Sequence, residues 1–118
     1  MTTQDIDVKW EKIVDFMSER FAQGEEKLDL QAILFFVGIQ ELGKGFKEFS
    51  KDEKMDLLHI AICKLLSRFD YYSFDKTDDE GWPHYKLNKT MPPLSPKKQN
   101  ELMKESLVYY FEEQGVEF

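Results

Sequence analysis

The sequence predicts an all-α fold: a single-domain bundle of about four helices that spans residues 1–118. Apolar residues recur at spacings of three and four over residues 5–22, 30–42, 51–70 and 96–114, which is the pattern of amphipathic helices. The length of 118 residues suits one domain with a core of its own. Apolar residues make up 42% and charged residues 33% of the chain, which is typical of a globular protein.

Segment 30–42 is expected to form the centre of this bundle. It carries no charge from Leu30 to Gln40, and its apolar residues point in nearly every direction on a helical wheel. Such a helix is buried or contacted from several sides. Asp29 is a candidate N-cap, and Gly43 is the expected stop. Gly38 inside the helix costs about 1 kcal/mol relative to Ala, which a closely packed neighbouring helix would offset.

Each of the other three helices has its own start signal or apolar face. Segment 51–70 begins with a capping box, in which Ser50 and Glu53 bond to each other's backbone, and it is apolar on two sides. Segment 96–114 begins with Ser95 as N-cap and a proline at the first helical position. Segment 5–22 has one apolar stripe, formed by Ile6, Trp10, Ile13, Val14, Met17 and Phe21.

Residues 71–95 are expected to form a long loop, because the helical period fails there and Gly and Pro are frequent. Within it, residues 75–81 read as a turn, and residues 84–88 are a candidate extended piece. The loop and its approach are rich in aromatic side chains, which predicts that it packs against the bundle: Phe69, Tyr71, Tyr72, Phe74, Trp82 and Tyr85.

Charge and composition argue against several classes of partner. The net charge of −7 opposes binding to the phosphates of nucleic acids and to anionic membrane surfaces. The longest uncharged apolar run has 11 residues, whereas a membrane span needs about 20. Cys63 is the only cysteine, which excludes an internal disulfide, and residues 1–12 lack the pattern of a secretory signal. We therefore expect a cytoplasmic protein that binds neither nucleic acid nor membrane.

The sharpest motif match is Gly38-Ile-Gln-Glu-Leu-Gly-Lys-Gly45, which fits the start of a phosphate-binding loop. Gly45 stands where the motif needs a serine or threonine to bind magnesium, and the Ile-Gln-Glu-Leu segment favours a helix. We interpret this stretch as the end of helix 30–42. A nucleotide site is the less favoured alternative.

The sequence patterns that could indicate a metal site or a catalytic site are weak. Asp75, Asp78, Asp79 and Glu80 precede Gly81, but this register does not place carboxylates where a calcium loop needs them. His59 and Cys63 are four residues apart, with Asp56 near the same face, yet zinc needs three or four ligands. A Cys–His nucleophile has no visible orienting partner. We expect no metal, no cofactor and no catalytic residue.

One basic stretch stands apart from the acidic remainder. Residues 81–100 contain no acid and carry Lys86, Lys89, Lys97 and Lys98. Lysines beside Trp82 and Tyr85 resemble a nucleic-acid surface, but four lysines in an acidic chain favour another reading. We expect them to pair with the chain's own acids, such as Glu112 and Glu113, or with an acidic partner.

The function favoured by the sequence is non-enzymatic protein–protein interaction, with self-association as a homodimer. The reason is the surplus of apolar surface on segments 30–42 and 51–70. The alternative is a small-molecule or nucleotide-binding protein, or a small enzyme, with a pocket between the 71–95 loop and the ends of these two helices. A third reading is a regulator that binds a basic protein in a salt-dependent way. The candidate pocket residues are His59, Tyr72, Trp82, His84 and Tyr85.

Overall fold

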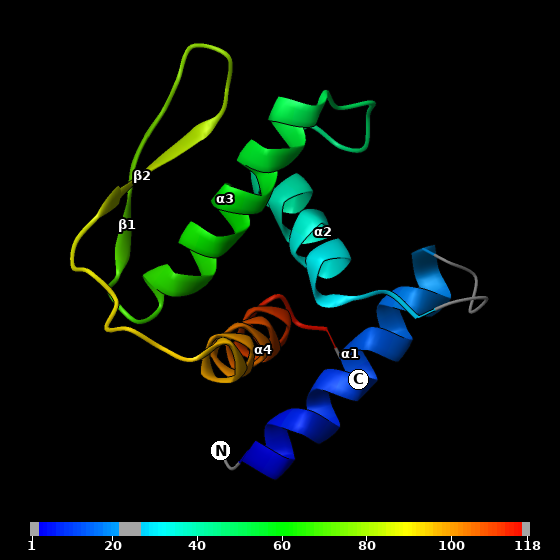
Figure 1. Cartoon of the computed structure of the whole chain (residues 1–118). Coiled ribbons are helices and arrows are strands. Elements are labelled where there is room, and N and C mark those ends of the chain that lie inside the picture. The colour runs from blue at the N-terminus through cyan, green and yellow to red at the C-terminus, as the bar shows by residue number, and fades with distance from the viewer. Residues whose placement is uncertain (1–2, 22–26, 117–118) are drawn as a thin grey trace. The chain divides into compact units, whose positions relative to one another are not determined.

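The computed structural model describes residues 3–21 and 27–116, and over these ranges the chain is largely helical (Figure 1). The elements in chain order are α1 (Thr3–Phe21), α2 (Leu30–Leu42), α3 (Lys51–Ser67), β1 (Tyr72–Thr77), β2 (Pro83–Leu87) and α4 (Pro96–Glu113). The four predicted helices are confirmed, while residue 22 of the first lies outside the described ranges. No helix in these ranges is both long and apolar enough to cross a membrane.

The prediction of an all-α fold is wrong in one region. Residues 72–87 form a two-stranded antiparallel sheet where the sequence indicated a loop. Tyr72 pairs with Leu87 and Phe74 with Tyr85, and the register shifts between Phe74 and Lys76. These cross-strand pairs lie on one face of the sheet, where neighbouring side chains stabilise the pairing. The rings of Phe74 and Tyr85 accordingly meet edge to face, with centroids 5.9 Å apart.

Helix ends follow the predicted capping signals, with one exception. The N–H of Ala32 donates to Asp29 Oδ1 at 2.8 Å, and Gly43 takes a positive φ of 76° after α2. Ser50 and Glu53 form the complete capping box of α3, and Ser95 caps α4. The exception is the end of α3, which stops at Ser67 instead of residue 70.

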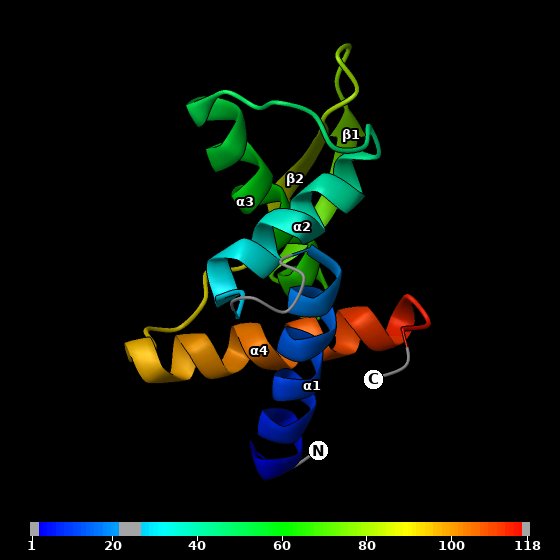
Figure 2. The ribbon, with the colours of Figure 1, turned by 90° about the vertical axis from the view of Figure 1, so that its right-hand side faces the viewer.

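The described chain divides into two compact units. The first consists of residues 1–33 and 93–118, and in it α1 packs against α4, which lies across it in Figure 2. Lys9 Nζ lies 3.4 Å from a carboxylate oxygen of Glu112, so α1 rather than the 81–100 stretch supplies this acid's basic neighbour. The predicted stripe of α1 is buried except for Phe21, which is 45% exposed.

The second unit, residues 34–92, contains most of α2 together with α3 and the hairpin. Figure 1 shows α3 between α2 on one side and the hairpin on the other. A Cβ atom at Gly38 would lie 2.3 Å from the carbonyl oxygen of Leu57, so the two helices approach closely there, as the sequence predicts. The core of this contact is formed by Ile39, Leu42, Phe49 and Leu57, with Phe35 and Trp82 against it.

The prediction of one domain over residues 1–118 is not tested by this division and stays a prediction. The same holds for the packing of all four helices as one bundle. The cavity that forms the candidate functional site lies entirely within the second unit.

Candidate functional site

A cavity of about 330 Å³ lies between α3 and the hairpin. This volume is near the lower end of the range of about 300–1,000 Å³ found for small-molecule sites. Helix α3 forms one wall, and the hairpin turn with β2 forms the other. The lining residues are Glu53, Asp56, His59 and Ile60 from α3, and Asp78, Glu80, Trp82, Pro83, His84 and Tyr85 from the hairpin.

The hairpin wall is organised by Asp78. Its Oδ1 accepts hydrogen bonds from the backbone N–H groups of Glu80 and Trp82, each at 2.9 Å, and its Oδ2 lies 2.8 Å from His84 Nε2. The hydrogen bond with His84, followed by the one from the Trp82 backbone, lowers the pKa of Asp78. Asp78 therefore stays charged, fixes the turn and orients the His84 ring.

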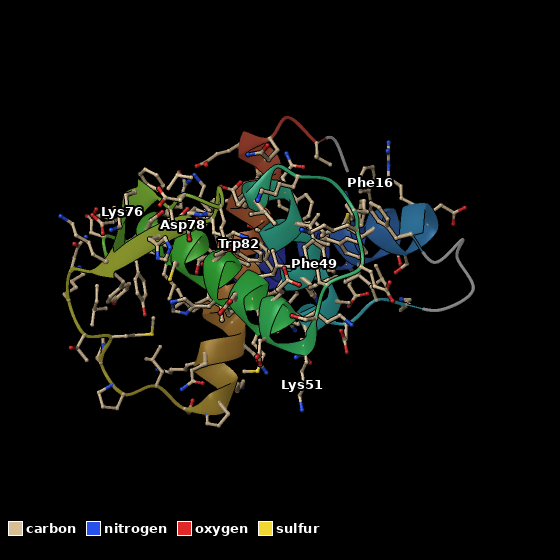
Figure 3. All side chains as sticks on the ribbon, turned by 90° about the horizontal axis from the view of Figure 1, so that it is seen from above. Phe16, Phe49, Lys51, Lys76, Asp78 and Trp82 are labelled. Carbon is tan, nitrogen blue, oxygen red and sulfur yellow. The ribbon has the colours of Figure 1, made fainter. Side chains whose placement is uncertain are left out.

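Trp82 connects this wall to the hydrophobic core of the unit. Figure 3 shows Trp82 between Asp78 and Phe49, and Trp82 packs against the cluster that contains Phe49 and Leu57. The turn is also held from outside, because Lys44 Nζ donates to the carbonyl oxygen of Glu80. Gly81 has a φ of 88°, which L side chains rarely adopt. The position of Trp82 is therefore set by the core on one side and the turn on the other.

The α3 wall follows from helical spacing. Residues three or four apart share a helix face, so Glu53, Asp56, His59 and Ile60 border the same cavity. Glu53 is held at the helix start, where the backbone N–H of Ser50 chiefly lowers the pKa of its carboxyl group. His59 is held from two sides. Its Nε2 lies 3.4 Å from Cys63 Sγ, and its ring meets that of Tyr72 edge to face.

Two reactive groups near the cavity are kept in their neutral forms. Cys63 is fully buried, and this burial raises the pKa of its thiol to about 11. Burial first, and then the negative charge of Glu41, raises the pKa of Tyr85 to about 12. A thiol that remains protonated is a poor nucleophile, which argues against the Cys–His pair as a catalytic site.

Four of the five residues proposed from the sequence border one cavity: His59, Trp82, His84 and Tyr85. Tyr72 is not among the lining residues and instead supports His59. The functional role of these residues stays a prediction. Sequence reasoning missed the other lining residues, namely Glu53, Asp56, Ile60, Asp78, Glu80 and Pro83. The spacing of Glu53, Asp56 and Ile60 around His59 is a signal that could have revealed the α3 wall.

The alternative motifs take other roles. Residues 38–42 are helical and Gly38 abuts α3, so this stretch does not form a phosphate-binding loop, and Gly43 ends the helix as interpreted. Among residues 3–21 and 27–116, no group of three or more His, Cys, Asp or Glu side chains is placed to hold a metal ion. In the acidic segment 75–81, both carboxylate oxygens of Asp78 are already engaged. Oδ1 accepts from the backbone of the turn, and Oδ2 bonds with His84.

The basic stretch does not form one surface within either compact unit. Lys86 and Lys89 belong to the unit of residues 34–92, whereas Lys97 and Lys98 belong to the other. Lys89 Nζ lies 4.8 Å from the ring centre of Tyr71, within the range of a cation–π contact. Comparisons with known proteins give no further guide: no family model, no curated protein and no solved structure matches this chain.

Proposed function

We propose that this chain is a non-enzymatic binding protein and that the cavity between α3 and the hairpin is its binding site. The observation that carries this proposal is the convergence of imidazole, aromatic and carboxylate side chains on one cavity of about 330 Å³. The state of the reactive groups supports binding over catalysis. The Cys63 thiol is buried with a raised pKa, and the Asp78 carboxylate is fully engaged in the turn.

Nuclear magnetic resonance tests this proposal with three sets of small fragments: cationic, neutral and anionic. At least one set is expected to give saturable shifts at the Trp82 indole and the His84 amide. His59→Ala, in the cavity lining, should weaken the response, whereas Lys51→Ala, an exposed position on the same helix, should leave it unchanged. If none of the three fragment sets shifts the resonances of the lining residues, the proposal is refuted.

A second proposal is that the chain forms a homodimer through the hairpin. It is supported by two large apolar side chains on one face of the sheet: Phe74 is 57% and Leu87 59% exposed. Exposed apolar surface of this kind favours association. The apolar residues of α2 support it less, because Ile33, Leu34, Val37, Ile39 and Leu42 are buried within the chain itself.

Size-exclusion chromatography with light scattering tests the dimer. At micromolar concentration the expected mass is twice the chain mass of 14.0 kDa. Phe74→Ser with Leu87→Ser should return it to one chain mass. The matched control is Val8→Ser, which replaces an exposed apolar residue on α1. A monomer in the wild type would refute the dimer and leave the binding site untouched.

We also propose a cytoplasmic location, which a single buried and reduced cysteine fits.

A further inference from the structure

The charged side chains that line the cavity are predominantly acidic. Helix α3 contributes the carboxylates of Glu53 and Asp56, and the hairpin contributes those of Asp78 and Glu80, whereas no lysine or arginine of residues 3–21 and 27–116 lines the cavity. Lys44 and Lys47 lie outside the lining, but their charges help to lower the pKa of Glu53, and Lys44 also donates to the backbone of Glu80. An anionic ligand such as a phosphate would meet repulsion from both walls.

The four carboxylates are not equally available to a ligand. Those of Asp78 and Glu53 accept hydrogen bonds within the turn and the helix cap, respectively. Asp56 and Glu80 differ, because their carboxylates make no hydrogen bond or ion pair with the described residues, 3–21 and 27–116. One stands on each wall of the cavity. Both residues are exposed, so their carboxylates are accessible to a cationic ligand, with which a carboxylate forms charge-assisted hydrogen bonds.

Aromatic side chains favour an organic cation over a metal ion. Trp82 and Tyr85 line the cavity, and Trp82 is anchored by the core cluster. Aromatic rings attract guanidinium and ammonium groups and also pack against their alkyl chains. The described carboxylates and imidazoles do not gather in a group that could hold a metal ion. The small volume of the cavity suits one side chain or one small amine.

We propose that this cavity binds an alkyl guanidinium or alkyl ammonium group, which pairs with Asp56 and Glu80 and packs its alkyl part against Trp82 and Tyr85. This inference rests on the proposed function and names the ligand chemistry of that site. The cation has two possible sources, a free amine or a basic side chain of another protein, and the experiment separates them.

The test is a titration followed by nuclear magnetic resonance and calorimetry with defined probes. Arginine blocked at both ends is compared with blocked citrulline, which has the same shape without the charge, and with blocked glutamate. Blocked arginine should shift the Trp82 indole resonance and bind about tenfold more tightly than citrulline. Its affinity should fall as salt is raised. Agmatine and an arginine-containing tripeptide are then compared: tighter binding of agmatine indicates a free amine, and tighter binding of the tripeptide indicates a protein side chain.

Variants with a matched charge change complete the test. Asp56→Asn with Glu80→Gln should weaken binding of blocked arginine by about tenfold. Asp52→Asn with Asp79→Asn removes the same charge from α3 and the turn but outside the cavity lining, and it should retain affinity. Equal binding of citrulline and arginine, or equal loss in both variants, would overturn the proposal. Binding of neutral or anionic probes alone would also overturn it while the proposed binding function stands. If no probe binds, both the proposed ligand chemistry and the proposed binding function are refuted.

Discussion

Helix α3 makes two very different contacts on its two sides. Against α2 it leaves no space, because Gly38 brings the backbones together and a Cβ there would lie 2.3 Å from Leu57 O. Against the hairpin it leaves a cavity of about 330 Å³ bordered by charged and aromatic side chains. The side facing α2 is held by apolar burial, whereas the side facing the hairpin is bordered by the turn that contains Asp78, by Trp82, and by Tyr72 against His59. The same helix thus belongs to the core on one side and forms the wall of the candidate site on the other.

The largest expected effect comes from closing the gap on the α2 side. Gly38→Ala places a methyl group against the backbone of Leu57, which cannot move without shifting α3. We expect a loss of about 3 kcal/mol in the free energy of unfolding, measured by urea unfolding with circular dichroism. The sign is diagnostic, since Gly→Ala in an unobstructed helix gains about 1 kcal/mol.

The matched control for Gly38→Ala is Gln40→Ala, an exposed position on the same helix. It should change stability by no more than about 0.5 kcal/mol. Should Gly38→Ala instead stabilise the protein, the close approach of α2 and α3 would be refuted, and with it the contrast between the two sides of α3.

The second effect concerns the buried thiol beside His59. The pKa of Cys63 is raised from 9.0 to about 11, so the folded state holds the thiol proton more tightly than the unfolded state. The stability that this provides is complete below pH 9 and is lost as the pH rises through 11. Two pKa units correspond to about 2.7 kcal/mol as an upper figure.

Urea unfolding at pH 8, 9 and 10, in the wild type and in Cys63→Ala, measures this loss. Stability should fall between pH 8 and pH 10 by about 1 kcal/mol more in the wild type than in the variant. Tyr85 titrates in the same direction, and most of its contribution cancels in the difference, because burial and Glu41, which both proteins share, raise its pKa more than Cys63 does. Parallel pH profiles would show that the thiol is not held in a dry environment.

The two sides of α3 also differ in how far the sequence predicts them. The α2 side is predicted almost residue by residue, because Asp29, Ser50 and Gly43 are local signals that act within one turn of helix. The hairpin is missed because its strands are short and mostly exposed, and because the register shift between Phe74 and Lys76 interrupts the alternation of β1. Its signal is the alternation of Tyr72 with Phe74 and of Tyr85 with Leu87, on either side of an Asp-rich turn.

The candidate site is predicted in part for the same reason. An aromatic cluster and two histidines are visible in the sequence, so Trp82, Tyr85, His59 and His84 are natural choices. Which carboxylates face them depends on the strand register, including the irregularity between Phe74 and Lys76. Without the hairpin, Asp78 reads as one of several solvated acids rather than as the residue that orients His84. For a similar reason, the sequence prediction includes Tyr72 among the cavity residues, whereas in the structure it contacts His59 and does not line the cavity.

The smallest expected effect is a local one, in the hairpin turn. The hydrogen bonds that lower the pKa of Asp78 below 3.8 stabilise the turn above that pH, and this support is lost as the pH falls through the lowered pKa. Asp78→Asn should weaken it at neutral pH, because a neutral amide oxygen accepts the N–H groups of Glu80 and Trp82 less strongly than a carboxylate does. Amide hydrogen exchange at Glu80 and Trp82 should become faster, while exchange within α3 stays unchanged. Asp79→Asn, which alters the neighbouring exposed acid, is the control. Equal exchange in both variants would mean that the core contact of Trp82, not the carboxylate of Asp78, holds the hairpin wall of the cavity.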